Sequence, residues 1–167
     1  GARRPLRWGV HGLALALLVA LPFSAAQLDP TMWALVMMVL VALGRSLALL
    51  GRDDEAVESF RAASRLSPED PALYKGLGDS LTRLARHADA AVAYTEATKR
   101  RGDDAATWLG LGSALARTGQ WDRAREALAQ ALALTPDDLE GARLYAQACR
   151  AAHRRDEAIT AHERALG

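Results

Sequence analysis

Apolar and small residues recur along the chain with a period of about 34 residues. Pro68 and Pro136 are separated by two of these periods, and they set the phase. The phase divides the sequence into four units, which are residues 37–70, 71–104, 105–138 and 139–167. A fixed period of this length is typical of repeat proteins, in which each unit is one supersecondary motif that stacks on its neighbours.

Within each unit the apolar positions form two stripes at helical spacing. Positions 4, 7 and 11 carry Leu40, Leu43 and Leu47, then Tyr74, Leu77 and Leu81, then Trp108, Leu111 and Leu115, then Ala142, Tyr145 and Cys149. Positions 20, 24 and 27 carry Ala56, Phe60 and Ala63, then Ala90, Tyr94 and Ala97, then Ala124, Leu128 and Ala131, then Ala158, His162 and Ala165. We therefore expect each unit to be two antiparallel helices whose stripes face each other.

Turn residues stand where this pairing needs them. Gly51 and Gly119 lie where the first helix must stop, as glycines in left-handed caps do. Pro68 and Pro136 are expected to end the second helices. Near the start of the second helices stand carboxylates that would suit the free N–H groups and the helix dipole, which are Asp54, Asp122 and Asp156.

The fourth unit departs from the pattern. Ala142 replaces the large residue at position 4, and His162 replaces the one at position 24. The sequence then stops at Gly167 without the solvating helix that repeat arrays usually need as a cap. We expect the C-terminal face to be an interface or a truncation.

These positions, taken together, resemble the tetratricopeptide-repeat (TPR) family over roughly residues 37–167. The resemblance implies an all-α fold, a right-handed TPR superhelix of four helix-turn-helix repeats with at least seven helices and no sheet, behind a hydrophobic N-terminal helical segment. The alternative is a generic Ala/Leu-rich bundle, which has no reason to keep so strict a phase.

The resemblance also implies that a protein or peptide partner binds in a concave groove, which first-helix positions 2, 5, 9, 12 and 13 line in TPR arrays. The residues at these positions that we expect to contact the partner are Arg45, Lys75, Asp79, Arg83, Leu109, Arg117, Arg143, Gln147 and Arg150. Chaperone-binding TPR domains clamp a C-terminal carboxylate with lysine and asparagine; Lys75 matches, whereas Asp79 stands in place of the asparagine. The alternative is that these arginines form a solvated face.

A basic and then apolar leader precedes the repeats. Arg3, Arg4 and Arg7 come before the uncharged segment Trp8–Ala26, which would span about 28 Å as a helix, close to the thickness of a hydrocarbon core. The segment is either a signal peptide, with residues 22–26 resembling a cleavage site, or a retained anchor, which we favour because the sequence begins before it. The arginines place the N-terminus in the cytoplasm of a bacterium. The repeats would then lie on the periplasmic side of the inner membrane, with residues 1–31 as the leader and residues 32–167 as the TPR domain.

The stretch from Met32 to Gly44 is apolar on every face, and Asp29-Pro30 ahead of it is typical of a helix start. An apolar helix of this kind must be covered by something. It either packs under the leader or in a protein interface, or it lies in or against the membrane, and this second alternative would make residues 3–51 a helical hairpin in the bilayer. The predicted hydrophobic contact surface consists of Met32, Trp33, Val36, Met37 and Val41.

Motifs for chemistry are scarce. A net charge of +1 argues against a nucleic-acid binder held by bulk charge. The segments Gly76-Leu77-Gly78 and Gly110-Leu111-Gly112 recur at the repeat period, so we interpret them as packing glycines rather than a phosphate loop. Cys149 with His153 and His162 could hold zinc, but a core thiol is the simpler interpretation. We predict no catalysis, no cofactor and no metal.

Two functions follow. The first is a membrane-associated scaffold or adaptor that holds a peptide or subunit, and the assembly of a membrane or cytochrome complex is one such role. An anchor followed by TPR units resembles the bacterial cytochrome c maturation TPR proteins, which present apocytochrome to the haem ligation machinery. The second is a structural accessory subunit of a membrane protein complex, which the apolar stretch from Met32 to Gly44 favours.

Overall fold

The computed structural model describes the backbone of residues 30–166 and the surroundings of the side chains of residues 31–153. The leader segment Trp8–Ala26 lies outside these residues. The described residues form seven helices and no strand. The helices are α2 (Pro30–Leu49), α3 (Asp53–Leu66), α4 (Pro71–Arg83), α5 (His87–Arg100), α6 (Ala105–Arg117), α7 (Trp121–Leu134) and α8 (Leu139–Leu166).

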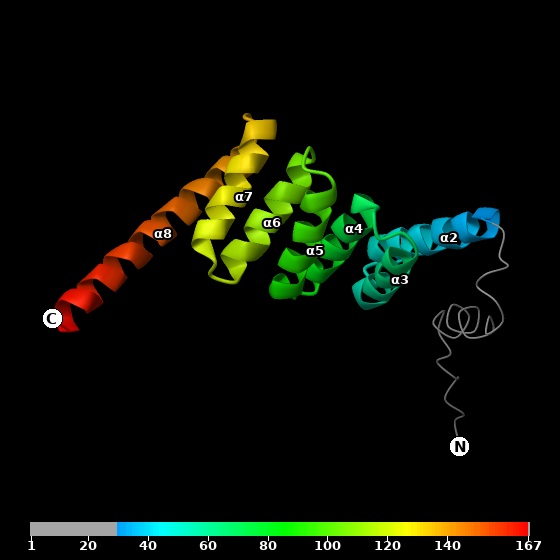
Figure 1. Cartoon of the computed structure of the whole chain (residues 1–167), viewed down its shortest axis with the longest axis horizontal. Helices are drawn as coiled ribbons and strands as arrows, with labels where there is room; N and C mark the ends of the chain where they lie inside the picture. Colours follow the sequence, from blue (N-terminus) through cyan, green and yellow to red (C-terminus); the bar gives the residue numbers. More distant parts are fainter. Residues whose placement is uncertain (1–29, 167) are drawn as a thin grey trace, which may run out of the picture.

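The helices pack as three successive pairs, α2 with α3, α4 with α5 and α6 with α7, followed by α8. Each pair also packs on the next one, so the array extends along one axis with α2 and α8 at its two ends (Figure 1). The helices α4, α6 and α8 begin at the first residues of the second, third and fourth units. The phase of the repeat and the all-α TPR superhelix are thereby confirmed.

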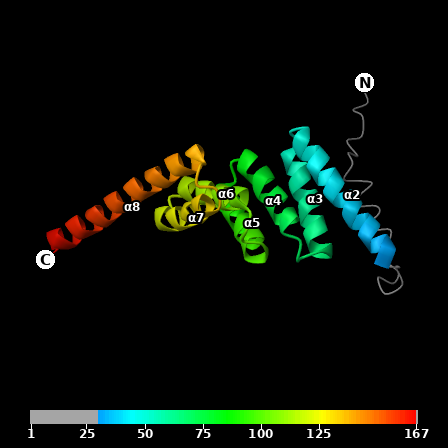
Figure 2. The ribbon, with the colours of Figure 1, turned by 90° about the horizontal axis from the view of Figure 1, so that it is seen from above.

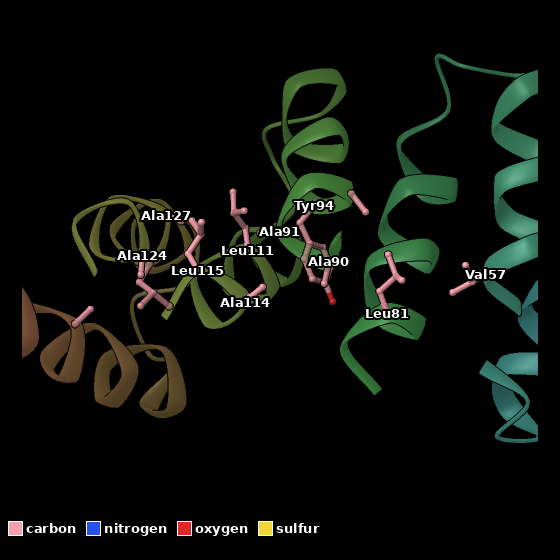
Figure 3. Close-up of a cluster of buried hydrophobic side chains, with 13 residues drawn as sticks. Val57, Leu81, Ala90, Ala91, Tyr94, Leu111, Ala114, Leu115, Ala124 and Ala127 are labelled. Carbon is pink, nitrogen blue, oxygen red and sulfur yellow. The ribbon is translucent and has the colours of Figure 1, made fainter. Parts of the chain in front are cut away.

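The stripe at positions 20, 24 and 27 forms the centre of the core. Ala56, Ala90 and Ala124 are completely buried, and Tyr94 and Leu128 are at most 3% exposed. Figure 3 shows Tyr94 of α5 between Leu81 of α4 and side chains of α6, so this core runs across the pairs rather than within one unit. Burying a side chain as large as leucine or phenylalanine stabilises the folded state by about 1.5–3 kcal/mol, because its apolar surface leaves water.

The glycines of the first helices make room for the large residues at position 24. A methyl group built on Gly78 would lie 2.7 Å from the ring of Tyr94, and one built on Gly110 would lie 2.6 Å from the same ring. Phe60 is enclosed in the same way by Gly44 and Gly76. One aromatic ring thus lies between glycines of two consecutive first helices, which confirms that these are packing glycines.

In the first three units, the turn between the two helices contains one residue with a left-handed backbone conformation, as predicted for the two glycines. Gly51 and Gly119 have φ angles of +71° and +76°, and Ala85 takes the same place in the second unit with a φ of +57°. The second helices α3 and α7 end two residues before Pro68 and Pro136, respectively.

The prediction for the helix starts was incomplete. Asp54 and Asp122 do lie in the first turns of α3 and α7, but the N-cap residues of these helices make no side-chain cap hydrogen bond. The capping carboxylates instead precede the first helices, where Asp70, Asp104 and Asp138 accept hydrogen bonds from backbone N–H groups at 2.9, 3.2 and 3.1 Å. A residue with an extended backbone just ahead of the helix presents its carboxylate to these groups.

The helix pair predicted for the fourth unit is wrong, because α8 runs without a turn from Leu139 to Leu166. The turn position of this unit carries His153, where two of the other units have glycine. Ala146 stands in place of the glycine that would admit a large position-24 residue, and that residue is itself replaced by His162. A fold-back would therefore bury less apolar surface while its turn would cost more, so the helix continues.

The aromatic residues at position 4 are less buried than predicted. Leu40 is 7% exposed, whereas Tyr74 and Trp108 are only half-buried. The guanidinium of Arg100 lies 4.2 Å from the centre of the Tyr74 ring, and Trp108 Nε1 donates a hydrogen bond of 2.8 Å to the carbonyl of Gly102. Both rings therefore lie at the edge of the core rather than inside it.

Candidate protein-binding groove

A cleft of about 450 Å³ lies between α2 and α4, with one wall supplied by α3. Its lining residues are Val41, Arg45, Ala48, Leu49, Phe60, Ala72, Lys75, Gly76, Asp79 and Arg83. All of them except Phe60 and Gly76 stand at the groove positions that the resemblance implied. The fold therefore brings the groove residues of the first two units together, and we call this site the α2–α4 cleft.

Two of the cations of the cleft are already paired inside the chain. Lys75 Nζ lies 2.8 Å from Asp104 Oδ2 at the start of α6. Arg83 donates from Nε to Asp53 Oδ1 at 2.8 Å, and this hydrogen bond raises the pKa of the guanidinium. Asp53 is nearly buried, so it depends on this partner. The first bridge joins α4 to the N-cap residue of α6 and the second joins α4 to α3, and together they take part of the positive charge out of the groove.

Asp79 is fixed by a buried tyrosine. The hydroxyl of Tyr94 donates a hydrogen bond of 2.7 Å to Asp79 Oδ1. Burial raises the pKa of Tyr94 well above its usual range, so the phenol stays protonated and remains a donor. The place that holds asparagine in the chaperone-type carboxylate clamp is thus occupied by a carboxylate held in one orientation. It would repel the terminal carboxylate of a peptide.

Arg45 differs from the other cations of the cleft. It is exposed, and among the described residues it has no ion-pair partner. The rest of the wall on its side is apolar, consisting of Val41, Ala48 and Leu49. The cleft therefore offers an apolar surface with one uncommitted guanidinium at its edge.

The remaining predicted groove residues lie outside this cleft. Leu109 is half-buried against the core of α4–α7. Arg117 lines a separate pocket beside the turn between α4 and α5, together with Arg86, His87 and Asp89. On α8, Arg143 pairs with Glu140 at 2.6 Å, and Gln147 and Arg150 are exposed. A binding role for these five positions remains a prediction.

Sequence reasoning missed Phe60 and Gly76 as cleft residues. Gly76 has no side chain, and a methyl group built on it would lie 2.6 Å from the ring of Phe60. The glycine therefore lets the cleft extend down to this ring, which is itself only 3% exposed.

A second, apolar cleft of about 620 Å³ adjoins the first and shares Val41 and Arg45 with it. It lies between the first half of α2 and the end of α3, and its lining residues are Trp33, Ala34, Met37, Met38, Val41, Ala42, Arg45, Leu66 and Ser67. Of the predicted contact surface, Trp33, Met37 and Val41 line this cleft. Met32 and Val36 do not line it but are 50% and 36% exposed on the same helix.

The described residues contain no group of three His, Cys, Asp or Glu side chains that could hold a metal ion. Cys149 is a free, half-buried thiol on α8, and His153 follows it one turn later. The side chain of His162, the third member of the zinc alternative, lies outside the described part.

Comparisons with known proteins agree with the architecture. Two tetratricopeptide-repeat family profiles match residues 39–72 and 81–148. Among curated proteins, none matches the sequence significantly. Solved structures with a similar fold include MamA, with a TM-score of 0.68 at 22% identity over 95% of this chain and 85% of that one. The first TPR of Spaghetti (RPAP3), bound to the HSP90 peptide SRMEEVD, has a TM-score of 0.67 at 19% identity over 77% and 99%.

The Sgt2 TPR domain from Aspergillus fumigatus is similar at a TM-score of 0.64 and 16% identity, covering 72% of this chain and 82% of that one. At these low identities, the TM-scores show that the fold is shared and nothing further. The two family profiles together cover more than half of the sequence, and their limits agree with the repeat phase and the stacked helix pairs. The chain therefore belongs to the tetratricopeptide-repeat family.

Proposed function

We propose that this protein is a membrane-associated scaffold that holds a peptide segment of a partner protein in the α2–α4 cleft. The observation that carries the proposal is the cleft itself, in which the groove positions of two units converge on an apolar wall. Concave, largely apolar sites with a few fixed polar groups are the usual sites of recognition. Binding of a partner is therefore the role that we assign to this cleft.

The charges of the cleft specify the kind of segment that it would hold. Lys75 and Arg83 are neutralised by Asp104 and Asp53, and Asp79 adds a carboxylate. The groove is therefore less basic than its composition indicates. A matching segment presents apolar side chains to Val41 and Leu49 and a single acidic side chain to Arg45. We infer an internal segment rather than a C-terminus, because Asp79 would repel a terminal carboxylate.

Related folds provide a parallel for peptide binding. The second TPR domain of human RPAP3 has been solved in complex with the HSP70 peptide SGPTIEEVD, and yeast Sti1 TPR2B has been solved in a complex with pHsp70. The peptide of the former contains both apolar and acidic residues. At 16% and 17% identity these structures share the fold with this chain, and their partners are not transferred to it.

We further propose that the leader retains the repeats at the bacterial inner membrane, with the groove on the periplasmic side. The uncharged segment Trp8–Ala26 and the three arginines before it support this topology. A role in the assembly of a membrane or cytochrome complex is one form of this function. The alternative, a structural accessory subunit, is favoured by the large exposed apolar area of α2.

The groove is tested by selecting displayed peptides against the full chain in detergent and measuring the affinity of the selected peptides by calorimetry. Ala72→Trp would fill the cleft from an exposed position, and Arg45→Glu would reverse its free cation. We expect each to weaken binding by about tenfold or more, which is about 1.4 kcal/mol. Ala129→Trp, on the exposed face of α7, is the matched control and should leave the affinity unchanged. Equal affinities for both tryptophan variants would mean that the partner uses another face.

The membrane attachment is tested separately by washing native membranes with alkaline carbonate. The full chain should stay with the membrane, whereas a chain that begins at Asp70 should be released. Protease added to spheroplasts should cleave the repeats, because they would lie outside the cytoplasm. Release of the full chain by the wash would contradict the anchor.

A further inference from the structure

The first half of α2 is an apolar surface that the repeats leave uncovered. Five large apolar side chains close together in sequence are exposed, which are Met32 at 50%, Leu35 at 56%, Val36 at 36%, Met38 at 61% and Val39 at 60%. Beyond them the exposed face of α2 carries Arg45 and Ser46, and the last residue of the helix, Leu49, is 89% exposed. Most of the exposed large apolar side chains of α2 therefore lie in its first half, at the end that is nearest the leader.

The length of α2 explains why this end is bare. At the rise of an α-helix, α2 extends for about 30 Å and the shorter α3 for about 21 Å. The end of α3 reaches only to Trp33 and Met37, which share the apolar cleft with Leu66 and Ser67. The first turns of α2 consequently project past the rest of the array, as Figures 1 and 2 show.

By length and hydropathy, α2 is the one helix in the described part that could cross a membrane, with a candidate span from Thr31 to Leu49. Its packing argues against a complete crossing. Leu40 and Leu47 are buried in one cluster with Phe60 and Ala63 of α3. A spanning α2 would either lose this core or draw α3 into the bilayer. The second option places the six charged side chains of α3 in hydrocarbon, where ionised groups are strongly disfavoured.

We propose that residues 30–39 of α2 insert into the outer surface of the membrane while its second half remains part of the repeat array. The inference rests on the proposed membrane attachment. The uncharged segment Trp8–Ala26 ends only a few residues before α2 begins, so an anchored leader would place the start of α2 at the bilayer surface. The exposed apolar residues would contact acyl chains, and Arg45, about 10 Å further along the helix than Met38, would lie at the level of lipid phosphates.

The proposal fixes the position of the groove. Because Val41 and Arg45 line both clefts, the α2–α4 cleft would open directly above the headgroups. A segment of a membrane protein close to the bilayer is then the kind of partner that can reach it.

Depth measurements on the full chain test this inference. Nitroxide labels are placed at Met32→Cys, Val39→Cys, Leu49→Cys and Val92→Cys, each with Cys149→Ser, in vesicles of phosphatidylcholine and phosphatidylglycerol. Val92 of α5 is the matched control for Val39, since it is the same residue type and 65% exposed. We expect labels at 32 and 39 to collide with oxygen rather than with a water-soluble nickel chelate. Labels at 49 and 92 should show the reverse.

A second pair of variants removes the apolar contact without touching the core. Met38→Asp should shift the label at position 32 from oxygen to nickel accessibility, whereas Val92→Asp should not. Circular dichroism should show unchanged melting for both, because both side chains are exposed.

Every other result overturns the inference in a distinguishable way. Flotation of the vesicles in a density gradient shows whether the chain is attached to them. If the chain floats but labels at 32 and 39 collide only with the nickel chelate, the first half of α2 is not in lipid, although the chain is attached to the membrane. Oxygen contact at 49 as well would mean that α2 crosses the bilayer. Protection of 32 and 39 from both reagents would mean that a second copy or the leader covers them. A chain that does not float at all contradicts the proposed attachment itself.

Discussion

At the residue scale, the repeat is organised around the side chain at position 24 and the glycine that faces it in the next unit. Phe60 faces Gly76, and Tyr94 faces Gly110. Where the third unit has the smaller Leu128, the fourth unit has Leu144, which packs against the same core. The size of the residue at position 24 thus decides whether position 6 of the next unit can carry a side chain. We therefore expect the effects of substitutions at these two positions on stability to be coupled.

We predict that Gly110→Leu destabilises the protein by about 1–3 kcal/mol or more, because its side chain would overlap the ring of Tyr94. Combining it with Tyr94→Leu reproduces the pair found between the third and fourth units. The double variant should therefore lose less stability than the sum of the single losses, by about 0.5–3 kcal/mol. Urea denaturation of the four proteins measures this coupling. Simple additivity would mean that the two side chains do not compete for one space.

A second residue-scale feature is an ion pair that recurs incompletely. Arg83 pairs with Asp53 across the first two units. One repeat later the equivalent positions hold Arg117 and His87, which line the same pocket, and Nδ1 of His87 is buried without a hydrogen-bond partner among the described residues. The second interface of the array therefore lacks the bridge that the first one has.

His87→Asp should restore the bridge and add a carboxylate to the first turn of α5. We expect a gain in stability of up to about 1 kcal/mol, visible as a higher melting temperature and reduced by added salt. The control is the same substitution combined with Arg117→Ala, which should lose the part of the gain that comes from pairing. A lower melting temperature for His87→Asp would show that the carboxylate cannot reach the guanidinium.

At the scale of the element, the sequence predicted helix ends correctly wherever a residue type has only one common structural role. Gly51 and Gly119 fixed two turns, and the prolines fixed the ends of α3 and α7. The helix starts were harder, because aspartates occur both ahead of the first helices and in the first turn of the second ones. Only backbone geometry decides which of them accepts a hydrogen bond from the helix N–H groups.

Asp104 combines a cap with a bridge, which predicts a pH dependence. Burial opposes its ionisation, but hydrogen bonds from Lys75 and Thr107 outweigh burial and lower its pKa. A group with a lowered folded-state pKa stabilises the fold above its unfolded pKa of about 3.9, and this stability is lost as the pH falls through the folded value. Asp104→Asn keeps a good cap without the charge.

We therefore expect Asp104→Asn to be less stable than the parent protein at about pH 6, and we expect the difference to shrink as the pH falls below about 3.9. Urea midpoints across this range measure the difference. Thr107→Val is a useful control, since it removes one hydrogen bond to the same carboxylate and keeps the bridge to Lys75. A stability difference that stays constant with pH would mean that the charge of Asp104 contributes nothing.

The fourth unit shows where sequence patterns stop being decisive. Its alanines at positions 20 and 27 kept the phase, so the pattern predicted a second helix. The turn, however, depends on whether folding back buries enough surface, and that depends on the combination of Ala146, His153 and His162. No single one of these residues forbids a helix pair, so the outcome emerges only when the three are weighed together.

At the scale of the whole molecule, the array is nearly one-dimensional, since each helix packs mainly on its neighbours in the chain. Stability in such a protein is approximately a sum over units and the interfaces between them. The first and last described helices, α2 and α8, have neighbours on one side only, as Figure 1 shows. The units that contain α4, α5, α6 and α7 are supported from both sides.

Native-state hydrogen exchange should reflect this arrangement. We predict the slowest amide exchange in α4–α7 and faster exchange in α8 and in α2, because an end helix can open without breaking two interfaces. Mass spectrometry of peptic fragments resolves these segments. In vesicles the first half of α2 should become protected while α8 is unchanged. Uniform exchange along the array would indicate a single cooperative unit.

The groove was predictable in position but not in character. The repeat phase identified the lining of the α2–α4 cleft, because groove positions are as periodic as core positions. It could not reveal that Lys75 and Arg83 already have partners, which are Asp104 at the start of α6 and Asp53 of α3, since such pairs depend on the stacking of the helices. The lysine and arginines at groove positions suggested free cations, and the internal bridges of Lys75 and Arg83 remove two of them.

These bridges have a consequence for anyone who would redesign the groove. In the third unit, Ala106 and Ser113 stand at groove positions and take no part in such a bridge, so a library there would change what is recognised and little else. In the second unit, Lys75 and Arg83 serve the joints between units as well as the groove. Variants at these two positions would differ in stability, and so in abundance, as well as in affinity for the partner. A cell-based selection for binding could not separate these two effects. A useful library would diversify the third unit first and keep both bridges of the second.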